Sequence, residues 1–390
     1  MRLAFLTSLV PVARPDTGFE IANAAILDAL RAAGHEVIAF GFQRPGEVPA
    51  DPEQAVVIAQ ADIENAAVGA GQKLRWIAAA LANGLPVACA KLRLLGDGRL
   101  VEAVKARGPF DAIVLNSVML PGAFPELLAL GPCLLVEHNI EHVSARQNAE
   151  HARNPLMRPL FAREARTLER VERRLWREAH FVWTLADEDR AGLGPELAAK
   201  SAVLPLVSNR REPPPAAGDE LKPAYDAGLI GTWSWAPNFI GLDWFLREVC
   251  PLLPADFSVA VAGRLPAAMA QLPPQVTLLG RVPAADAFLR SCRIVALSSR
   301  AGTGVQLKTV EALELGLPAV ATTLSCRGFT GMPDNVTRAD TPAAFAEALV
   351  ARVVAIRAGD RQRIDGAAFM AQQRKALADA LERGLAVARR

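Results

Sequence analysis

The alternation of apolar runs with helical patterns constrains the fold of this chain more than any other feature. Residues 2–8 and 36–42 have the length and apolar content of buried strands. Residues 19–33, between them, have the periodicity of a helix that ends at Gly34. Repeated strand–helix–strand units form a parallel sheet with helices on its faces. The sequence therefore predicts an α/β protein.

The alternation breaks once, at residues 207–225, where three consecutive prolines favour an extended connector. We predict two Rossmann-like domains, residues 1–206 and 226–360, joined by a linker at 207–225. Residues 361–390 are predicted to form a helix that returns toward the first domain and packs across the junction. Further strands are predicted at 112–116, 133–137, 181–185 and 202–206 before the break, and at 228–231, 257–262, 276–279, 294–298 and 318–322 after it.

The charge balance excludes one class of function. Lys and Arg total 43 and Asp and Glu total 41, without the basic excess of a dedicated nucleic-acid-binding protein, so we expect no nucleic-acid partner. The five cysteines stand singly, without the paired spacing of a zinc site, and we predict no metal. No apolar run reaches the ~18 residues of a membrane span. We expect a cytoplasmic protein that at most makes peripheral contact with the inner face of the cell membrane.

The segment 298–322 carries the clearest chemical signal. It has the pattern of a strand, a loop with Gly302 and Gly304, a helix that begins near Gln306, and a second strand. Glycines let the backbone approach a ligand closely, and the N-terminus of the following helix presents unpaired N–H groups and the positive end of its dipole. We therefore expect this loop to bind a phosphate group.

Two charged residues follow within this helix. Lys308 lies in the first turn, where a cation is unfavourable for the helix dipole, so its presence indicates an anionic ligand such as a diphosphate. Glu311 lies three residues further, on the same face, and can accept hydrogen bonds from both hydroxyls of a ribose. The pair predicts a site for a nucleotide-diphosphate sugar. The alternative is a surface salt bridge between the two side chains.

This segment resembles the C-terminal donor site of GT-B glycosyltransferases of family 4, or group 1. The resemblance implies two Rossmann-like domains that face each other across a cleft. It also implies transfer of sugar from a UDP- or GDP-sugar to a hydroxyl of a saccharide or lipid-linked saccharide, with retained configuration and no cofactor. Thr303 stands where many members have a sugar-binding glutamate. The family pattern Glu-Ala-x-x-x-Gly-x-Pro-x-Val is matched by Glu311, Ala312, Gly316, Pro318 and Val320.

A second block, residues 231–245, resembles the opening of the donor domain in a bacterial branch of this family. Gly231, Trp235 and Asn238 fall on its pattern Gly-x-x-x-Trp-x-Pro-Asn, and the resemblance assigns them to donor binding. We add Arg264 and Arg281 as donor-binding candidates. A tryptophan beside a strand end is more often a packing residue, so the role of Trp235 stays open.

The resemblance assigns the acceptor to the N-terminal domain. His138 follows the strand predicted at 133–137 and matches the cleft histidine of the family. It is a catalytic candidate together with Lys308 and Asp16, although a structural role at a strand end is the alternative. The acceptor-side candidates are Thr17, Gly18, Glu137 and Glu141.

Rival interpretations remain open for one segment and for the function. Residues 158–177 contain arginines, interleaved glutamates and an apolar stripe, which favours a solvated amphipathic helix over a membrane-binding one. One rival function is a catalytically silent nucleotide-sugar-binding or scaffold protein in a polysaccharide-assembly complex. The other is an inverting transferase that acts on a natural-product aglycone with Asp16, Glu137 or Glu141 as its base.

Overall fold

The computed structural model of the 390-residue chain describes residues 1–15, 17–63, 68–150, 157–208, 210, 223–264, 272–329, 331–360 and 362–389. The chain forms two compact units. Unit 1 comprises Met1–Pro205 and Lys375–Arg390, and unit 2 comprises Leu206–Arg374. Asp16 and most of the predicted linker lie outside the described residues.

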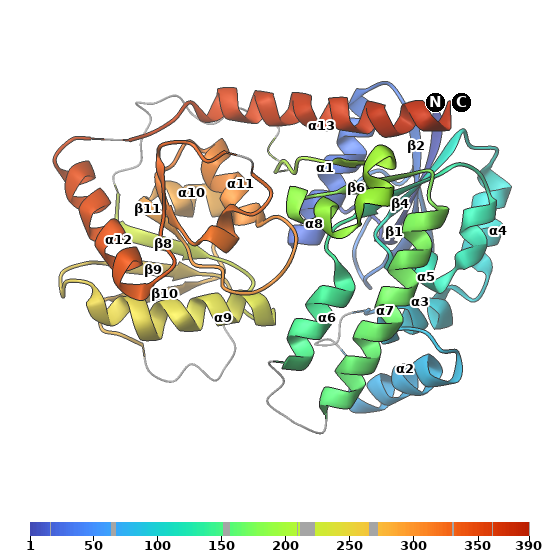
Figure 1. Ribbon diagram of the computed structural model, residues 1–390, viewed down its shortest axis with the longest axis horizontal. Coiled ribbons are helices and arrows are strands. Elements are labelled where there is room, and N and C mark those ends of the chain that lie inside the picture. The colour runs from blue at the N-terminus through green and yellow to red at the C-terminus, as the bar shows by residue number, and fades with distance from the viewer. Residues whose placement is uncertain are drawn as a thin grey trace. The chain divides into compact units, whose positions relative to one another are not determined.

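Unit 1 is built on a seven-stranded parallel sheet with the strand order β3-β2-β1-β4-β5-β6-β7 (Figure 1). The chain runs outward from β1 on one side and then crosses to β4 on the other, so the order reverses between these two strands. Open α/β sheets bind ligands at this point, beyond the carboxyl ends of the strands. The strands are β1 (Arg2–Leu9), β2 (Glu36–Gln43), β3 (Ala55–Gln60), β4 (Ala112–Asn116), β5 (Cys133–Glu137), β6 (Phe181–Thr184) and β7 (Ser201–Val203).

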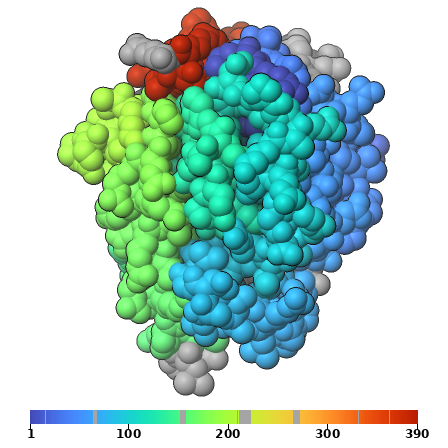
Figure 2. Space-filling view, turned by 90° about the vertical axis from the view of Figure 1, so that its right-hand side faces the viewer, coloured from blue at the N-terminus to red at the C-terminus, as the bar shows by residue number. Residues whose placement is uncertain are grey.

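Helices cover the sheet of unit 1, and alternate strand residues pack beneath them. Leu6, Phe40 and Leu115 form one core with residues of α3, α4, α5 and α7. Phe5 and Val114, on the opposite face, are also completely buried. Figure 2 shows α2 to α5, in light blue to teal, beside α7, in yellow-green. The helices are α1 (Gly18–Ala32), α2 (Ala70–Ala82), α3 (Val87–Gly96), α4 (Arg99–Arg107), α5 (Met119–Ala123), α6 (Glu141–Glu150), α7 (Arg158–Glu178) and α8 (Asp187–Gly192), with the 3₁₀ turns η1 (Pro125–Ala129) and η3 (Pro195–Lys200).

Unit 2 is built on a six-stranded parallel sheet with the order β10-β9-β8-β11-β12-β13, which reverses between β8 and β11. The strands are β8 (Tyr225–Ile230), β9 (Val259–Ala262), β10 (Val276–Gly280), β11 (Cys292–Leu297), β12 (Ala319–Ala321) and β13 (Val336–Arg338). The helices are α9 (Ala236–Trp244), α10 (Ala285–Arg290), α11 (Leu307–Glu314) and α12 (Pro342–Arg357), with the short turns η4 (Phe245–Val249), η5 (Cys250–Leu252) and η6 (Thr323–Cys326).

The sheet of unit 2 is buried on both faces. Val261 and Ile294 belong to a core with residues of α9 and α12. Their neighbours Ala262 and Val295 belong to a second core with residues of α10 and α11. Because side chains alternate along a strand, burial on both faces requires continuously apolar strands, which is the pattern on which the sequence prediction rested.

Helix α13 (Gly366–Ala388) contributes to both units, since its residues up to Arg374 belong to unit 2 and those from Lys375 onward belong to unit 1. Within unit 1, Trp183 Nε1 donates a hydrogen bond to the carbonyl of Ala380 at 2.8 Å. A Cβ atom on Gly384 would lie 2.2 Å from the Trp183 ring, so only glycine fits there. Among the described residues, no single helix is long and apolar enough to span a membrane, although α2 and α3, bent by 99°, meet that test together.

The predicted fold class, two Rossmann-like α/β units, is confirmed. Strands β4 and β5 have the predicted bounds. The sequence analysis assigned no strand to β3 or β13, which lie at the edges of the two sheets. Strand β13 has only three residues, a weak signal, whereas β3 has the apolar run Ala55–Ala59, which the sequence analysis missed.

Candidate active site

Two segments that the sequence analysis singled out separately meet at the carboxyl edge of the sheet in unit 2. Helix α9 follows β8, and the loop with Gly302 and Gly304 follows β11. A Cβ atom on Gly241 of α9 would lie 2.4 Å from the carbonyl oxygen of Ser298, and one on Gly302 would lie 3.4 Å from Pro237 Cβ. The loops after β8 and β11 therefore flank the reversal of strand order, where a ligand is expected.

Both glycines of this loop have the left-handed backbone that favours glycine, with φ of +105° at Gly302 and +74° at Gly304. No side chain caps the following helix α11, so N–H groups in its first turn remain available to a ligand. Thr303, between the glycines, is buried. The loop therefore has the backbone geometry of an anion site.

Hydroxyl groups that the sequence analysis missed hold this loop in place. Ser325 Oγ donates to the carbonyl of Leu297 at 2.7 Å and accepts from Ser299 N at 3.0 Å. Thr322 Oγ1 donates to the carbonyl of Ser299 at 2.6 Å. Ser299 Oγ in turn donates to Gln306 Oε1 at 3.3 Å. These residues follow β11 and β12 directly, and polar residues after neighbouring apolar strands were the signal that could have revealed them.

The Lys308 ammonium lies beside the loop that follows β8. Its Nζ donates to Asn238 Oδ1 at 3.4 Å and lies 6.0 Å from the centre of the Trp233 ring. Trp233 is itself held by a 2.8 Å hydrogen bond from Nε1 to the carbonyl of Ala262. Burial lowers the pKa of Lys308 to about 8. Within the described part of the chain no carboxylate pairs with Lys308, so the surface salt bridge with Glu311 is not formed.

Glu311 lies on the same helix in a setting that disfavours its charge. Burial first, and then the neighbouring Glu314, raise the pKa of Glu311 to about 7, while Arg210 acts in the opposite direction. Glu314 is completely buried and accepts hydrogen bonds from the backbone N–H of Ser208 at 3.0 Å and from the Ser208 hydroxyl. The start of unit 2 is thereby tied to α11.

The other donor-binding candidates differ in how close they lie to this cluster. Gly231 contacts the Trp233 ring, because a Cβ atom there would lie 3.2 Å from it. Trp235 is 47% exposed. Arg264 is exposed and follows β9, the strand next to β8. Arg281 follows β10, one strand further out, and strands lie ~4.8 Å apart, so it is the most distant candidate from the loop after β8.

A second polar cluster lies at the strand-order reversal of unit 1. His138, directly after β5, hydrogen bonds through Nε2 to Asn116 Oδ1 at 2.8 Å. Asn116 Nδ2 donates to Asn23 Oδ1 at 2.9 Å, and Asn23 Nδ2 donates to the carbonyl of Leu9 at 2.7 Å. Because Asn116 Oδ1 is an acceptor, His138 Nε2 carries a proton. Burial lowers the pKa of His138 to about 4, so the ring is neutral near pH 7.

Sequence reasoning missed the asparagines of this cluster. Asn116 ends an otherwise apolar strand, and that polar strand end was the available signal. The next residue, Ser117, is buried with φ of +106°, a conformation that costs about 1–3 kcal/mol in a non-glycine residue and often occurs at functional sites.

The first loop of unit 1 has a structural role at the described positions. Thr17 caps α1: its Oγ1 accepts from Glu20 N at 3.3 Å, and its own N–H donates to Glu20 Oε2 at 3.1 Å. A Cβ atom on Gly18 would meet open space. The Phe19 ring lies 5.2 Å from the His138 ring, which brings the start of α1 to this cluster.

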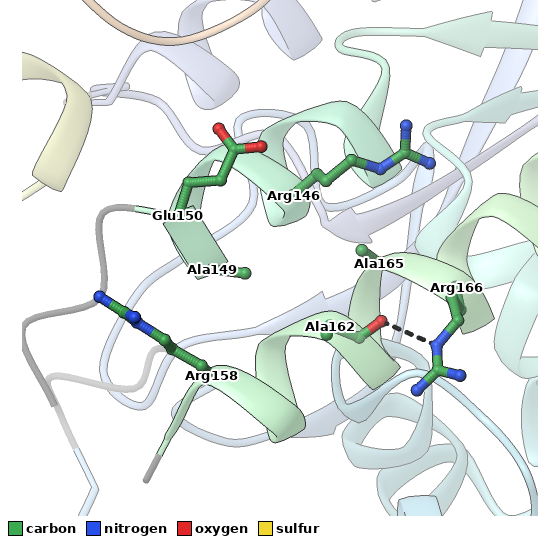
Figure 3. A pocket seen from close by; sticks show the side chains of 7 residues that line it. All are labelled: Arg146, Ala149, Glu150, Arg158, Ala162, Ala165 and Arg166. Atoms are coloured by element: carbon green, nitrogen blue, oxygen red, sulfur yellow. Dashed lines mark hydrogen bonds between the residues drawn. The ribbon is translucent and has the colours of Figure 1, made fainter. Parts of the chain in front are cut away.

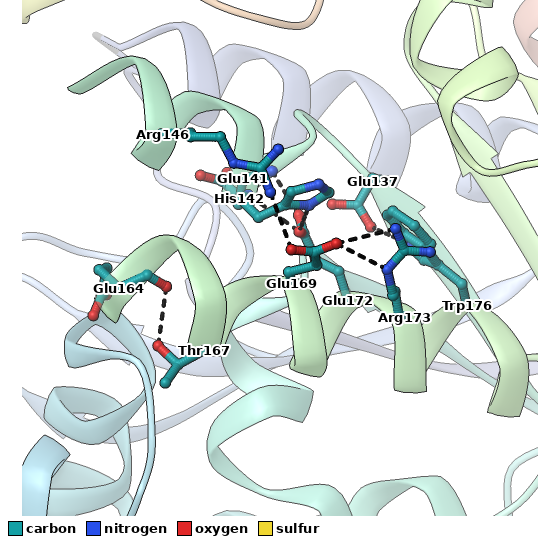
Figure 4. Close-up of polar contacts among 10 residues, drawn as sticks. All are labelled: Glu137, Glu141, His142, Arg146, Glu164, Thr167, Glu169, Glu172, Arg173 and Trp176. Carbon is teal, nitrogen blue, oxygen red and sulfur yellow. Dashed lines mark hydrogen bonds and ion pairs between the residues drawn. The ribbon is translucent and has the colours of Figure 1, made fainter. Parts of the chain in front are cut away.

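The acceptor-side glutamates belong to a buried network between α6 and α7 (Figure 4). Glu137 is 1% exposed and accepts from Trp176 Nε1 at 2.7 Å. Burial and the nearby Glu172 hold the pKa of Glu137 well above its usual range. Glu137 thus contacts Trp176 of this network, whereas His138 hydrogen bonds to Asn116.

Glu172 is the centre of this network. It accepts the backbone N–H groups of Glu141 at 2.5 Å and His142 at 3.1 Å, and His142 Nδ1 lies 2.5 Å from it. Burial raises the pKa of Glu141 to about 7. The described residues contain no group of three or more His, Cys, Asp or Glu side chains that could hold a metal ion.

Comparison with known proteins agrees with this geometry. Residues 225–355 match the family described as glycosyl transferases group 1. Over 98% of the chain, the structure is similar to 97% of the sucrose-phosphate synthase from Thermosynechococcus elongatus, with a TM-score of 0.66 and 16% identity. Residues 225–355 thus have the sequence pattern of group 1 glycosyl transferases, and the chain as a whole has the GT-B fold.

Two further solved structures have the same fold. Anabaena HepE in complex with UDP and glucose has a TM-score of 0.62 and 14% identity, covering 98% of this chain and 99% of that one. WaaG, a glycosyltransferase involved in lipopolysaccharide biosynthesis, has a TM-score of 0.58 and 14% identity, covering 97% and 95%. No curated protein matches the sequence. The residues of the family match include the glycine loop, Lys308 and Glu311.

Proposed function

We propose that this glycosyltransferase moves a sugar from a UDP- or GDP-sugar to a hydroxyl of a saccharide or lipid-linked saccharide. The observation that carries this proposal is the position of Lys308. It lies in the first turn of α11, directly after the loop with Gly302 and Gly304, at the strand-order reversal of unit 2. A partly buried ammonium without a carboxylate partner among the described residues, next to available backbone N–H groups, is arranged for an anion that arrives with the substrate.

The chemistry of the step explains why these groups are needed. As the glycosidic bond to the diphosphate breaks, the sugar takes on oxocarbenium character and the leaving group gathers negative charge. Lys308 and the N–H groups of the loop stabilise that charge. Glu311 accepts hydrogen bonds from the ribose hydroxyls of the same donor. The complex of HepE with UDP and glucose supports the choice of a nucleotide-sugar.

The state of His138 favours retention of configuration. A base with a pKa of about 4 is poorly matched to proton transfer near pH 7, and Nε2 already donates to Asn116. His138 is therefore better suited to binding the transferred sugar than to activating the acceptor. In a retaining front-face reaction, the leaving phosphate takes the acceptor proton. Inversion would need a base, and Glu141, with a pKa of about 7, is the described carboxyl best tuned for it.

The acceptor class and the reaction conditions are part of the same proposal. WaaG is involved in lipopolysaccharide biosynthesis, which supports a saccharide or lipid-linked acceptor. We also propose that no metal cofactor is needed, since Lys308 supplies the positive charge at the diphosphate. Full activity after chelation with EDTA is expected, and loss of activity that Mg²⁺ restores would contradict a metal-free reaction.

Calorimetric titration of the full chain with UDP, GDP, ADP and dTDP is the first test. One nucleotide should bind selectively, and Lys308→Ala and Glu311→Ala should both weaken it. Lys375→Ala, which removes an exposed lysine of α13, is the control and should bind as the wild type does. Absence of binding to all four nucleotides would overturn the proposal. Binding without donor hydrolysis or transfer would indicate a silent binding protein, and the anomeric signal of the product in NMR distinguishes retention from inversion.

A further inference from the structure

A pocket of about 500 Å³ lies between α6 and α7 of unit 1 (Figure 3). Its volume falls within the ~300–1,000 Å³ of typical small-molecule sites. Neither the donor-site residues nor His138 belong to its lining. Its lining consists of Arg146, Ala149, Glu150, Arg158, Ala162, Ala165 and Arg166.

The described contacts hold the two helices together near the start of α6. There Glu172 of α7 accepts backbone N–H groups at the start of α6, and Arg146 Nη2 pairs with Glu169 Oε2 at 3.0 Å. Ala145 packs with Ala165 and Leu168 at the same level. Further along, the facing side chains are alanines, which are too small to fill the space between the helices.

The lining combines an apolar centre with a cationic rim. In Figure 3 the side chains of Ala149, Ala162 and Ala165 point into the space between the helices, and the longer arginine side chains surround it. Three arginines and one glutamate make the lining net positive. Such a surface fits a ligand that has both an apolar part and an anionic group.

The arginine side chains of the rim have N–H groups that can still donate hydrogen bonds to such a ligand. Arg146 shares the carboxylate of Glu169 with Arg173, so one negative charge serves two guanidinium groups. Arg166 uses only Nε, which donates to the carbonyl of Ala162 at 3.3 Å. Among the residues that the structure describes, Arg158 has no hydrogen-bond or ion-pair partner. An anion bound at the rim would therefore pair with guanidinium groups whose charge is only partly balanced.

We propose that this pocket binds the phosphate ester of an amphiphilic molecule, with its hydrocarbon part against the alanines and its phosphate on Arg158 at the rim. Helix α6 begins at Glu141, three residues after His138, so Arg146 lies only about 7.5 Å along the helix axis from its start. The ligand is accordingly assigned as the lipid-phosphate part of the acceptor. That assignment rests on the proposed transferase function, whereas binding to the pocket does not.

Binding of short-chain dihexanoyl phosphatidic acid, measured by calorimetry below its micelle concentration without donor, tests the proposal. We expect the full chain to bind it and Arg158→Gln to weaken binding about fivefold, the scale of an exposed ion pair. Ala149→Leu keeps every charge but fills the space, and should weaken binding by a similar factor. Arg177→Gln removes the same charge from the last turn of α7 and should have no effect.

Each alternative outcome overturns the proposal in a distinct way. Equal binding of inorganic phosphate would indicate a simple anion site, and equal binding of neutral dihexanoylglycerol would exclude a role for the arginines. Equal weakening by Arg177→Gln, or binding only to phosphatidic-acid vesicles, would indicate a charged surface instead of a pocket. Absence of lipid binding by a protein that still binds its nucleotide would refute this inference alone. Lipid binding without nucleotide binding would refute only the transferase proposal.

Discussion

The charge state of Lys308 leads to a quantitative test of the donor site. Burial lowers its pKa from the ordinary 10.5 to about 8. At about 1.4 kcal/mol per pH unit, the empty site disfavours the charged form by about 3 kcal/mol. A bound diphosphate restores the favourable environment of the ammonium. Lys308→Gln should therefore lose most of a charge-assisted interaction of about 1.5–3 kcal/mol, which weakens nucleotide binding by a factor of about 10–150.

The sign of the pH dependence follows from the same pKa. In the free protein Lys308 loses its proton as the pH rises through about 8. The bound diphosphate favours the charged form and raises this pKa, so binding above pH 8 takes up a proton. The dissociation constant should stay flat from about pH 7 to about pH 8 and then rise up to about tenfold per pH unit. The phosphate group itself titrates near a pKa of about 6, below this window.

Calorimetry in buffers of different ionisation enthalpy counts the protons taken up. For the wild type we expect uptake near zero at about pH 7 and approaching one proton at about pH 9. Lys308→Gln should bind weakly with no uptake at either pH, and an unchanged melting temperature would show that it folds. Uptake that persists in Lys308→Gln would refute the assignment of the titrating group to Lys308. A wild type without uptake at high pH would refute the whole argument.

Further predictions concern three other residues. Glu311→Gln keeps the side-chain shape but removes the charge, so it should weaken nucleotide binding about tenfold and leave pyrophosphate binding unchanged. If calorimetry showed that the binding of both ligands is weakened equally, this would argue against a ribose contact. The pKa of His138 is about 4, so the rate profile of the wild type should lack an inflection near the usual histidine value of about 6.5; an inflection there that His138→Ala abolishes would contradict the neutral, hydrogen-bonding state. Gly241→Ala places a Cβ atom 2.4 Å from the Ser298 carbonyl and should cost about 1–3 kcal/mol in thermal unfolding while weakening nucleotide binding. Its control is Gly331→Ala, where a Cβ atom meets nothing within 4 Å and stability should not change.

The site residues were predicted from two kinds of evidence, the spacing of neighbouring residues and the family resemblance. Lys308 and Glu311 lie three residues apart on one helix, and helical periodicity alone puts them on one face. Thr17 and Glu137, by contrast, were assigned through the resemblance alone. In the structure Thr17 caps α1 and Glu137 is buried against Trp176. Capping and burial depend on which face of an element meets a neighbour, which the sequence pattern around these residues does not state.

The sequence by itself determined the fold class, the positions of most of the buried strands, and a glycine loop followed by a helix that carries a lysine and a glutamate on one face. These features are encoded over a few neighbouring residues, in apolar runs, glycines and helical spacing. Only the tertiary structure decided that Asn238 meets Lys308, that Asn23 and Asn116 support His138, and that α6 and α7 leave a pocket between them. Those contacts join residues from 22 to 93 positions apart. They form only because the strand order brings particular loops together, and no local pattern specifies that order.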